Sequence, residues 1–204
     1  MSIANPSKID FERGMNVIPP LTILLILTNV VIFGITIVRG SLQSEEAIIA
    51  AGALVRDRVL HGEVWRLASS MFLHGGLDHL AGNCIGLYIA GIAAEHAWGL
   101  SGAAMIYFGS GLLGAVASVA LHPGPSVGAS GAIFGLLGGV IVFFWKYGSD
   151  FHVRDKRVGN VLLIWAAYSL GTAYFAPLID NAAHMGGILG GSIVGLLITP
   201  RYRA

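Results

Sequence analysis

The chain has 204 residues, of which 55% are hydrophobic and only 11% charged, and its mean hydropathy is +0.75. Because an ordinary soluble domain carries about 25% charged residues, this composition excludes a water-soluble globule and indicates an integral membrane protein. A net charge of +1 provides no field to attract phosphates, so we expect no nucleic-acid partner. The single cysteine, Cys84, excludes internal disulfides and a cysteine-based structural zinc site.

Six stretches are long and apolar enough, or nearly so, to cross a bilayer core, which takes about 20 helical residues. They are residues 19–38, 77–98, 102–121, 126–145, 158–176 and 182–199. The sequence therefore predicts an all-α, polytopic membrane protein, with a six-transmembrane-helix bundle over residues 19–199 and short tails at 1–18 and 200–204. The connection 39–76 mixes apolar residues with charges, which is typical of amphipathic segments lying on the outer leaflet.

Lysine and arginine favour the cytoplasmic side of short connections. With six spans, one side of the membrane holds eight of them, namely Lys8, Arg13, Lys146, Arg154, Lys156, Arg157, Arg201 and Arg203. The other side holds four, namely Arg39, Arg56, Arg58 and Arg66. This bias predicts that both termini are cytoplasmic. Because the N-terminal segment contains Asp10 and Glu12 and does not read as a mitochondrial transit peptide, we expect a bacterial plasma (inner) membrane.

Polar residues inside the predicted spans fall on alternate helices. Asn83, Ser130 and His184 lie about six, four and two residues from the starts of their spans. Even-numbered spans of such a bundle run in the same direction, so a rise of 1.5 Å per residue places the three within roughly 6 Å in depth, near the outer surface. A hydroxyl, an imidazole and a carboxamide at one level indicate a serine hydrolase.

Each of these residues also has a structural interpretation. Ser130 could cap its own helix, His184 could be a core histidine bonded to a carbonyl, and Asn83 could join helices. Stripes of small residues at every fourth position predict that the helices of Ser130 and His184 touch, which is compatible with packing alone. The stripes are Gly131, Gly135 and Gly139 in one helix and Ala183, Gly187, Gly191 and Gly195 in the other.

Four motifs, in the same order along the chain, resemble the rhomboid family of intramembrane serine proteases. They are Trp65-Arg66, the run His74-Gly-Gly-Leu-Asp-His79-Leu-Ala-Gly-Asn83, Gly128-Ala129-Ser130-Gly131 followed by Phe134, and Ala183-His184-Met185-Gly186-Gly187. The resemblance covers roughly residues 20–199. Gly-x-Ser-Gly alone is a weak signal, but four motifs on the appropriate elements are specific.

The resemblance implies hydrolysis of peptide bonds in or near transmembrane helices of other membrane proteins through a Ser-His dyad. Ser130 would be the nucleophile and His184 its general base, and His79, Asn83 and the backbone N–H of Ser130 would form the oxyanion hole. Gly128 would let the backbone approach the substrate carbonyl. Phe134 stands where many relatives have a tyrosine, so its ring can stack on His184 but the hydroxyl is missing.

Other residues of these segments are expected to support the site or the structure around it. Asp180, four residues before His184, could orient the imidazole, although we expect Asp180 to lie in a solvated loop. His74 is expected to fix the first loop against the second span. Trp65 and Arg66 are expected to anchor that loop among lipid headgroups.

Two other classes of function compete with a protease. A non-catalytic rhomboid-like protein would bind membrane clients, but this chain has both the nucleophile and the base. A small transporter or channel would favour inverted repeats or a row of intramembrane charges, which this sequence does not display. The sequence has no His-Glu-x-x-His motif, so we expect no metal and no cofactor. The expected partners are transmembrane-helix substrates and membrane lipids.

Overall fold

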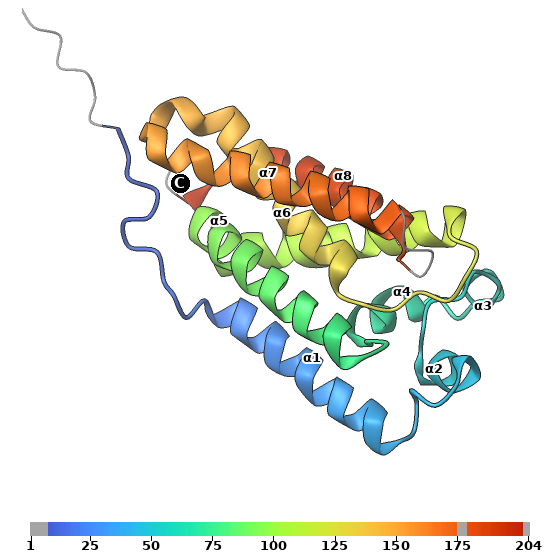
Figure 1. Cartoon of the computed structure of the whole chain (residues 1–204). Coiled ribbons are helices and arrows are strands. Elements are labelled where there is room, and N and C mark those ends of the chain that lie inside the picture. The colour runs from blue at the N-terminus through green and yellow to red at the C-terminus, as the bar shows by residue number, and fades with distance from the viewer. Residues whose placement is uncertain (1–7, 175–178, 202–204) are drawn as a thin grey trace, which may run out of the picture.

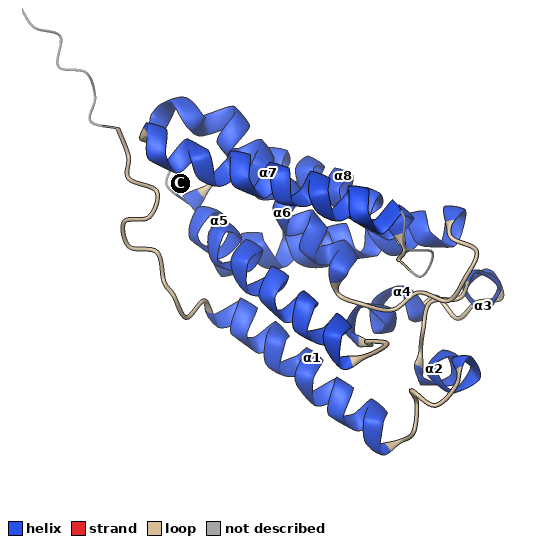
Figure 2. Ribbon diagram, in the orientation of Figure 1, coloured by secondary structure: helices blue, strands red, loops and turns tan. Residues whose placement is uncertain are grey.

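The computed structural model describes residues 8–174 and 179–201. Within these residues every regular element is a helix, and no strand occurs beyond isolated β-bridges (Figures 1 and 2). The prediction of an all-α protein is therefore confirmed.

The first long helix, α1 (Pro20–Val38), is tied at its start to the longest one, α5 (Leu77–Leu121). Glu95 of α5 accepts hydrogen bonds from the N–H groups of Leu21 (3.3 Å) and Thr22 (2.7 Å) and from the Thr22 hydroxyl (2.6 Å). The first N–H groups of a helix have no partner within the helix, and its N-terminus carries partial positive charge. A buried carboxylate from α5 therefore supplies both acceptors and a counter-charge to α1.

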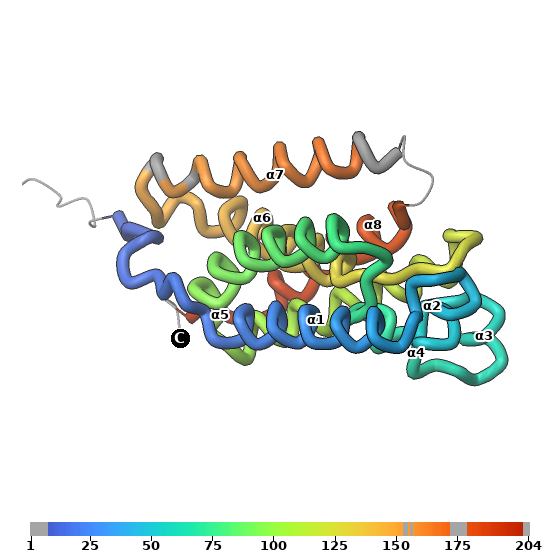
Figure 3. Tube along the Cα trace, turned by 60° about the horizontal axis from the view of Figure 1, so that its bottom comes forward, coloured from blue at the N-terminus to red at the C-terminus, as the bar shows by residue number. Residues whose placement is uncertain are grey.

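Helix α5 consists of two arms that meet at Gly99, whose backbone (φ 71°, ψ −179°) is not helical. This left-handed φ suits glycine, which lacks a Cβ. The chain reverses direction there, as Figures 1 and 3 show. The two arms correspond to the predicted spans 77–98 and 102–121, so the sequence located this reversal to within a few residues.

Between α1 and α5 the chain forms three short helices and one 3-10 turn. These are α2 (Glu45–Ala51), α3 (Arg56–Leu60), α4 (Arg66–Ser69) and η1 (Ser70–Phe72). Arg66 holds this connection together from inside, since its guanidinium donates to the carbonyls of Ile49 (2.6 Å) and Ala53 (2.8 Å). The same guanidinium pairs with Glu63 at 2.6 Å.

The expectation that Arg66 reaches lipid headgroups is wrong. Its side chain is only 5% exposed, because the carbonyls at the end of α2 and the Glu63 carboxylate take up its donors. Trp65 is half exposed, and the Arg66 guanidinium lies 4.6 Å from the centre of its ring. The pair therefore organises the loop itself.

The helices α6 (Ser130–Tyr147) and α8 (Asn181–Leu197) pack backbone against backbone. A Cβ atom placed on Gly187 would collide with the carbonyl oxygen of Gly131, and one on Gly191 would collide with that of Gly135. The expected contact between the two stripes of small residues is confirmed. No side chain separates these helices at those positions, so their spacing is fixed by the main chain.

The helix α7 (Val153–Tyr174) follows the 3-10 turn η2 (Gly148–Asp150) and packs on α6, where Gly159 faces the Phe144 ring. The N-terminal segment also joins this end of the molecule. Ile9 donates its N–H to the carbonyl of Asp150, and Phe11 is 3% exposed. The segment expected to be only a polar tail is thus held here from residue 9 onward, because the Phe11 ring is buried among other aromatic rings.

Two helix starts differ from the predicted spans. Helix α6 begins at Ser130 rather than at residue 126, because Ser126 exchanges backbone hydrogen bonds with Leu54. Helix α7 begins at Val153 rather than at residue 158. The end of that predicted span, residues 175–176, lies outside the described residues.

By length and composition, three stretches of the described chain could cross a membrane: Pro20–Val38, Leu77–Leu121 and Ser130–Asp150. The second has 45 residues, which span about 68 Å as helix and suffice for two crossings. Helix α8 is apolar but shorter, with 17 residues. The chain is therefore an integral membrane protein with several apolar helices.

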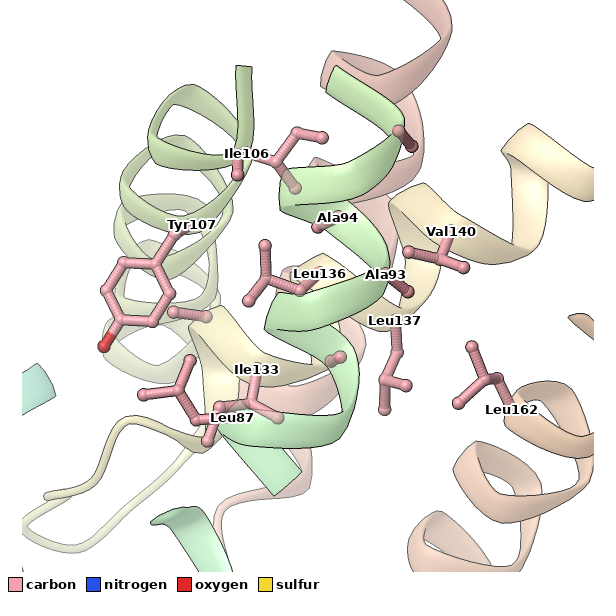
Figure 4. Packing of buried hydrophobic residues seen from close by; sticks show 14 of the residues in the cluster. Leu87, Ala93, Ala94, Ile106, Tyr107, Ile133, Leu136, Leu137, Val140 and Leu162 are labelled. Atoms are coloured by element: carbon pink, nitrogen blue, oxygen red, sulfur yellow. The ribbon is translucent and has the colours of Figure 1, made fainter. Parts of the chain in front are cut away.

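The buried core lies where the two arms of α5 meet α6. Figure 4 shows Leu87 and Ile106, one from each arm of α5, beside Ile133 and Leu136 of α6. All four are at most 4% exposed. Close packing of these side chains holds the starts of α5 and α6 in a fixed relation.

Candidate active site

Ser130 is the first residue of α6 and follows a segment fixed by backbone contacts. Gly128 donates its N–H to the Ser70 carbonyl (2.9 Å) and has φ +130°, which only glycine adopts without strain. The residue at the N-cap of α6 is Ala129, which has no capping side chain. The Ser130 hydroxyl bonds to another helix, so the interpretation of Ser130 as a capping residue is wrong.

The partner of Ser130 is His184, in the first turn of α8. The Nε2 atom of His184 lies 2.8 Å from Oγ of Ser130, and the histidine is only 7% exposed. Its Nδ1 has no hydrogen-bond partner among the described residues. The interpretation of His184 as a core histidine bonded to a carbonyl is therefore wrong as well.

One turn along α6 from Ser130, Phe134 supports the imidazole. The rings of Phe134 and His184 are stacked, with centroids 4.3 Å apart and planes inclined by 25°. This is the contact that the sequence predicted. Within the described part of the chain Nδ1 of His184 has no partner, so the stacking on Phe134 and the bond to Ser130 orient the ring.

His79 and Asn83 bring two nitrogen atoms close to Gly128. A Cβ atom at Gly128 would lie 2.8 Å from Nε2 of His79 and 3.5 Å from Nδ2 of Asn83. Asn83 is 7% exposed and its Nδ2 has no partner within the described chain. The missing Cβ thus leaves room for two side-chain nitrogens beside the start of α6.

Ser130, His184, His79 and Asn83 all line one cavity of about 550 Å³. Its walls come from the starts of α5, α6 and α8 and from the segments that precede them. The structure therefore gathers all four predicted side chains, from three helices, around a single space. An imidazole bonded to a hydroxyl can activate that oxygen as a nucleophile, and nitrogen donors such as those of His79 and Asn83 in the same cavity can stabilise an oxyanion.

Asp180 lies at this cavity but does not bond to the His184 ring. Its Oδ1 accepts the N–H of Ala183 (2.9 Å) and so caps α8, and it also lies 3.9 Å from Nδ1 of His122. Asp180 is 9% exposed, so the expectation that it lies in a solvated loop is wrong. It supports the start of α8 rather than the imidazole directly.

His74 is a further titratable group behind the cavity. It is fully buried, and its ring meets the His79 ring edge-on, with centroids 5.2 Å apart. Burial, and then the nearby His79, lower the pKa of His74 to about 4. His74 is therefore neutral at neutral pH and packs directly against His79.

Comparison with known proteins gives one family and several relatives. Residues 61–201 match the family model of the rhomboid domain. The rhomboid protease GluP of Bacillus subtilis (strain 168) is 34% identical over 181 residues, which make up 89% of this chain and 34% of that protein. The rhomboid protease AarA of Providencia stuartii is 31% identical over 221 residues, covering 96% and 76% of the two chains.

A plant relative is also similar. RHOMBOID-like protein 5 of Arabidopsis thaliana is 38% identical over 157 residues, or 74% of this chain and 50% of that protein. The chain therefore spans between a third and a half of the length of the Bacillus and Arabidopsis relatives.

Proposed function

The chain belongs to the rhomboid family, and from this membership and the geometry of the cavity we propose that it is an intramembrane serine protease. Its reaction would be hydrolysis of peptide bonds in or near transmembrane helices of other membrane proteins. The observation that carries this proposal is the 2.8 Å contact between Nε2 of His184 and Oγ of Ser130.

In the proposed reaction, Ser130 attacks the substrate carbonyl while His184 accepts the hydroxyl proton at Nε2. The tetrahedral intermediate collapses when the imidazolium returns this proton to the leaving amine, and an ester to Ser130 remains. A water molecule, deprotonated in turn by His184, then hydrolyses the ester and regenerates the hydroxyl. In each of the two steps Nε2 of His184 accepts one proton and gives it back, so these proton transfers require no third residue.

The oxyanion of each intermediate would lie between His79, Asn83 and the backbone N–H of Ser130. Such donors contribute about 3–4 kcal/mol each when they are preorganised. The unpartnered Nδ2 of Asn83 supports this role, because a buried donor without a partner is available to a developing negative charge. The N-terminus of α6 adds partial positive charge at the same place.

We further propose that the bundle has six spans: α1, both arms of α5, α6, α7 and α8. Both termini would be cytoplasmic, and the cavity would open toward the outer side of a bacterial plasma membrane. The distribution of lysine and arginine supports this orientation. Because a helix hides its carbonyls in its own hydrogen bonds, substrates should carry weak helix formers near the cut.

Fluorophosphonate labelling of the purified chain in detergent tests the proposal without a known substrate. We expect labelling of the wild type and its loss in both Ser130→Ala and His184→Ala. Ser126→Ala, a change at another serine of the same cavity, is the matched control and should label normally. A folded wild type that does not label would support a non-catalytic client-binding protein instead, and labelling that survives Ser130→Ala would mean a different nucleophile.

A further inference from the structure

A second cavity, of about 450 Å³, lies between the last turns of α1, the helix α2 and Leu73. No described residue lines both this cavity and the cavity of Ser130. Apolar side chains form most of its wall, among them Ile32, Ile35, Ala50 and Leu73. Its polar contribution comes from α1 and the turn that follows, where Arg39 and Ser41 stand.

Among the described residues, Arg39 is the only charged one in this lining, and it comes directly after the apolar stretch of α1. It follows Val38 directly, and Val38 ends the apolar stretch of α1. The Arg39 side chain is exposed, and among the described residues it has neither an ion pair nor a side-chain hydrogen bond. An exposed guanidinium therefore lies beside apolar walls at the end of a helix that is long and apolar enough to span a membrane.

Backbone geometry fixes both walls of the cavity. At the end of α1, Gly40 (φ +67°) donates to the Ile37 carbonyl and Ser41 to that of Thr36, which is a Schellman motif. Helix α2 ends in the same way at Gly52 (φ +117°). Two helix ends locked by this motif make the cavity preformed, so a ligand would not have to order it.

We propose that this cavity binds one diacyl phospholipid of the outer leaflet. The phosphate diester would bind the Arg39 guanidinium beside Ser41, since guanidinium groups match phosphate oxygens in geometry and charge. An acyl chain would lie against Ile32, Ile35 and Leu73 and be held by van der Waals contact with these side chains. The apolar wall does not suit the charged phosphate, and the guanidinium does not suit an acyl chain. The lipid can therefore bind in one orientation only.

The bound lipid would also touch the segment that leads into α5. Leu73 is 4% exposed and directly precedes His74, which packs on His79. An acyl chain against Leu73 would therefore support the segment that carries His74. This consequence depends on the lipid alone and not on the proposed chemistry.

Native mass spectrometry of the full chain, released from detergent with phosphatidylethanolamine added, tests the proposal. We expect the wild type to retain one lipid, and Arg39→Gln to bind it about tenfold more weakly because a charge-assisted contact is lost. Ala50→Trp, which places a large side chain in the cavity, should abolish retention. Arg58→Gln is the matched control, because Arg58 belongs to the same connection but lies outside the cavity.

Two further probes identify the occupant. Diacylglycerol has the acyl chains but no phosphate. The wild type should therefore bind it as weakly as Arg39→Gln binds phosphatidylethanolamine. Millimolar inorganic phosphate should leave the lipid bound, whereas its displacement would show a simple anion site. Equal lipid retention by the wild type and Arg39→Gln, with both variants folded by circular dichroism, would overturn the proposal.

Discussion

The contact between α6 and α8 and the connection between α1 and α5 border the same cavity, yet different interactions hold them. Between α6 and α8 the main chains touch, and the carbonyl of Gly135 occupies the place where a side chain of residue 191 would be. In the connection, the buried Arg66 side chain joins α2 to the segment before α5. The helix pair should therefore tolerate no added atom, whereas the connection should depend on one charged group.

The largest effect is expected when a side chain is added between the helices. Gly191→Val would force α8 away from α6, and we expect a loss of more than about 4 kcal/mol in the free energy of unfolding, with loss of Ser130 labelling. Thermal unfolding followed by circular dichroism in detergent measures this effect. Gly34→Ala is the control, because nothing lies within 4 Å of a Cβ at Gly34 on α1. An unchanged melting temperature for Gly191→Val would show that the helices are not in backbone contact.

The second effect separates the connection from the helix pair. Arg66→Met leaves the carbonyls of Ile49 and Ala53 without their donor, and the loss of these two charge-assisted hydrogen bonds should cost about 3–4 kcal/mol. Arg58→Gln breaks the exposed pair with Glu63 and should cost less than about 1 kcal/mol. At temperatures below its lowered melting point, Arg66→Met should still label at Ser130, because α6 and α8 keep their contact. Equal melting temperatures of the two variants would contradict this role of Arg66.

The part of the molecule that the sequence predicts well is the part held by small residues. A four-residue repeat of glycine and alanine implies closely packed helices whatever else surrounds them. The contact of α6 with α8, and with it the contact of Ser130 with His184, could therefore be predicted from the sequence. The direction of the Arg66 side chain could not be predicted, because it depends on carbonyls 13 and 17 residues away along the chain. The burial of Asp180 and Phe11 likewise depends on segments that are distant in sequence.

The third effect concerns His74, where the connection joins α5. The folded chain binds a proton at His74 only near pH 4, whereas the unfolded chain binds it near the usual pKa of 6.5. Between these values the unfolded state holds more protons, so the free energy of unfolding should fall as the pH drops from about 6.5 to about 4, by up to about 3 kcal/mol. Denaturation measured at a series of pH values in this window gives the slope. His74→Phe should make this slope less steep, and an identical slope in the variant would assign the effect to other groups.

The smallest effect is expected for two phenylalanines of α6. Their comparison tests whether this helix orients the His184 imidazole in addition to packing against α8. Phe134 stacks on His184, whereas Phe144 packs on Phe11 at the other end of α6. An aromatic contact of this kind contributes about 0.5–1.5 kcal/mol, so Phe134→Leu should slow fluorophosphonate labelling about three- to tenfold with little change in melting temperature. Phe144→Leu should lower the melting temperature and leave the labelling rate unchanged. The Phe144 ring is part of the aromatic packing and touches neither Ser130 nor His184. If both variants slowed labelling equally, the stacking on His184 would be ordinary packing, and the orientation of the imidazole would rest on its bond to Ser130 alone.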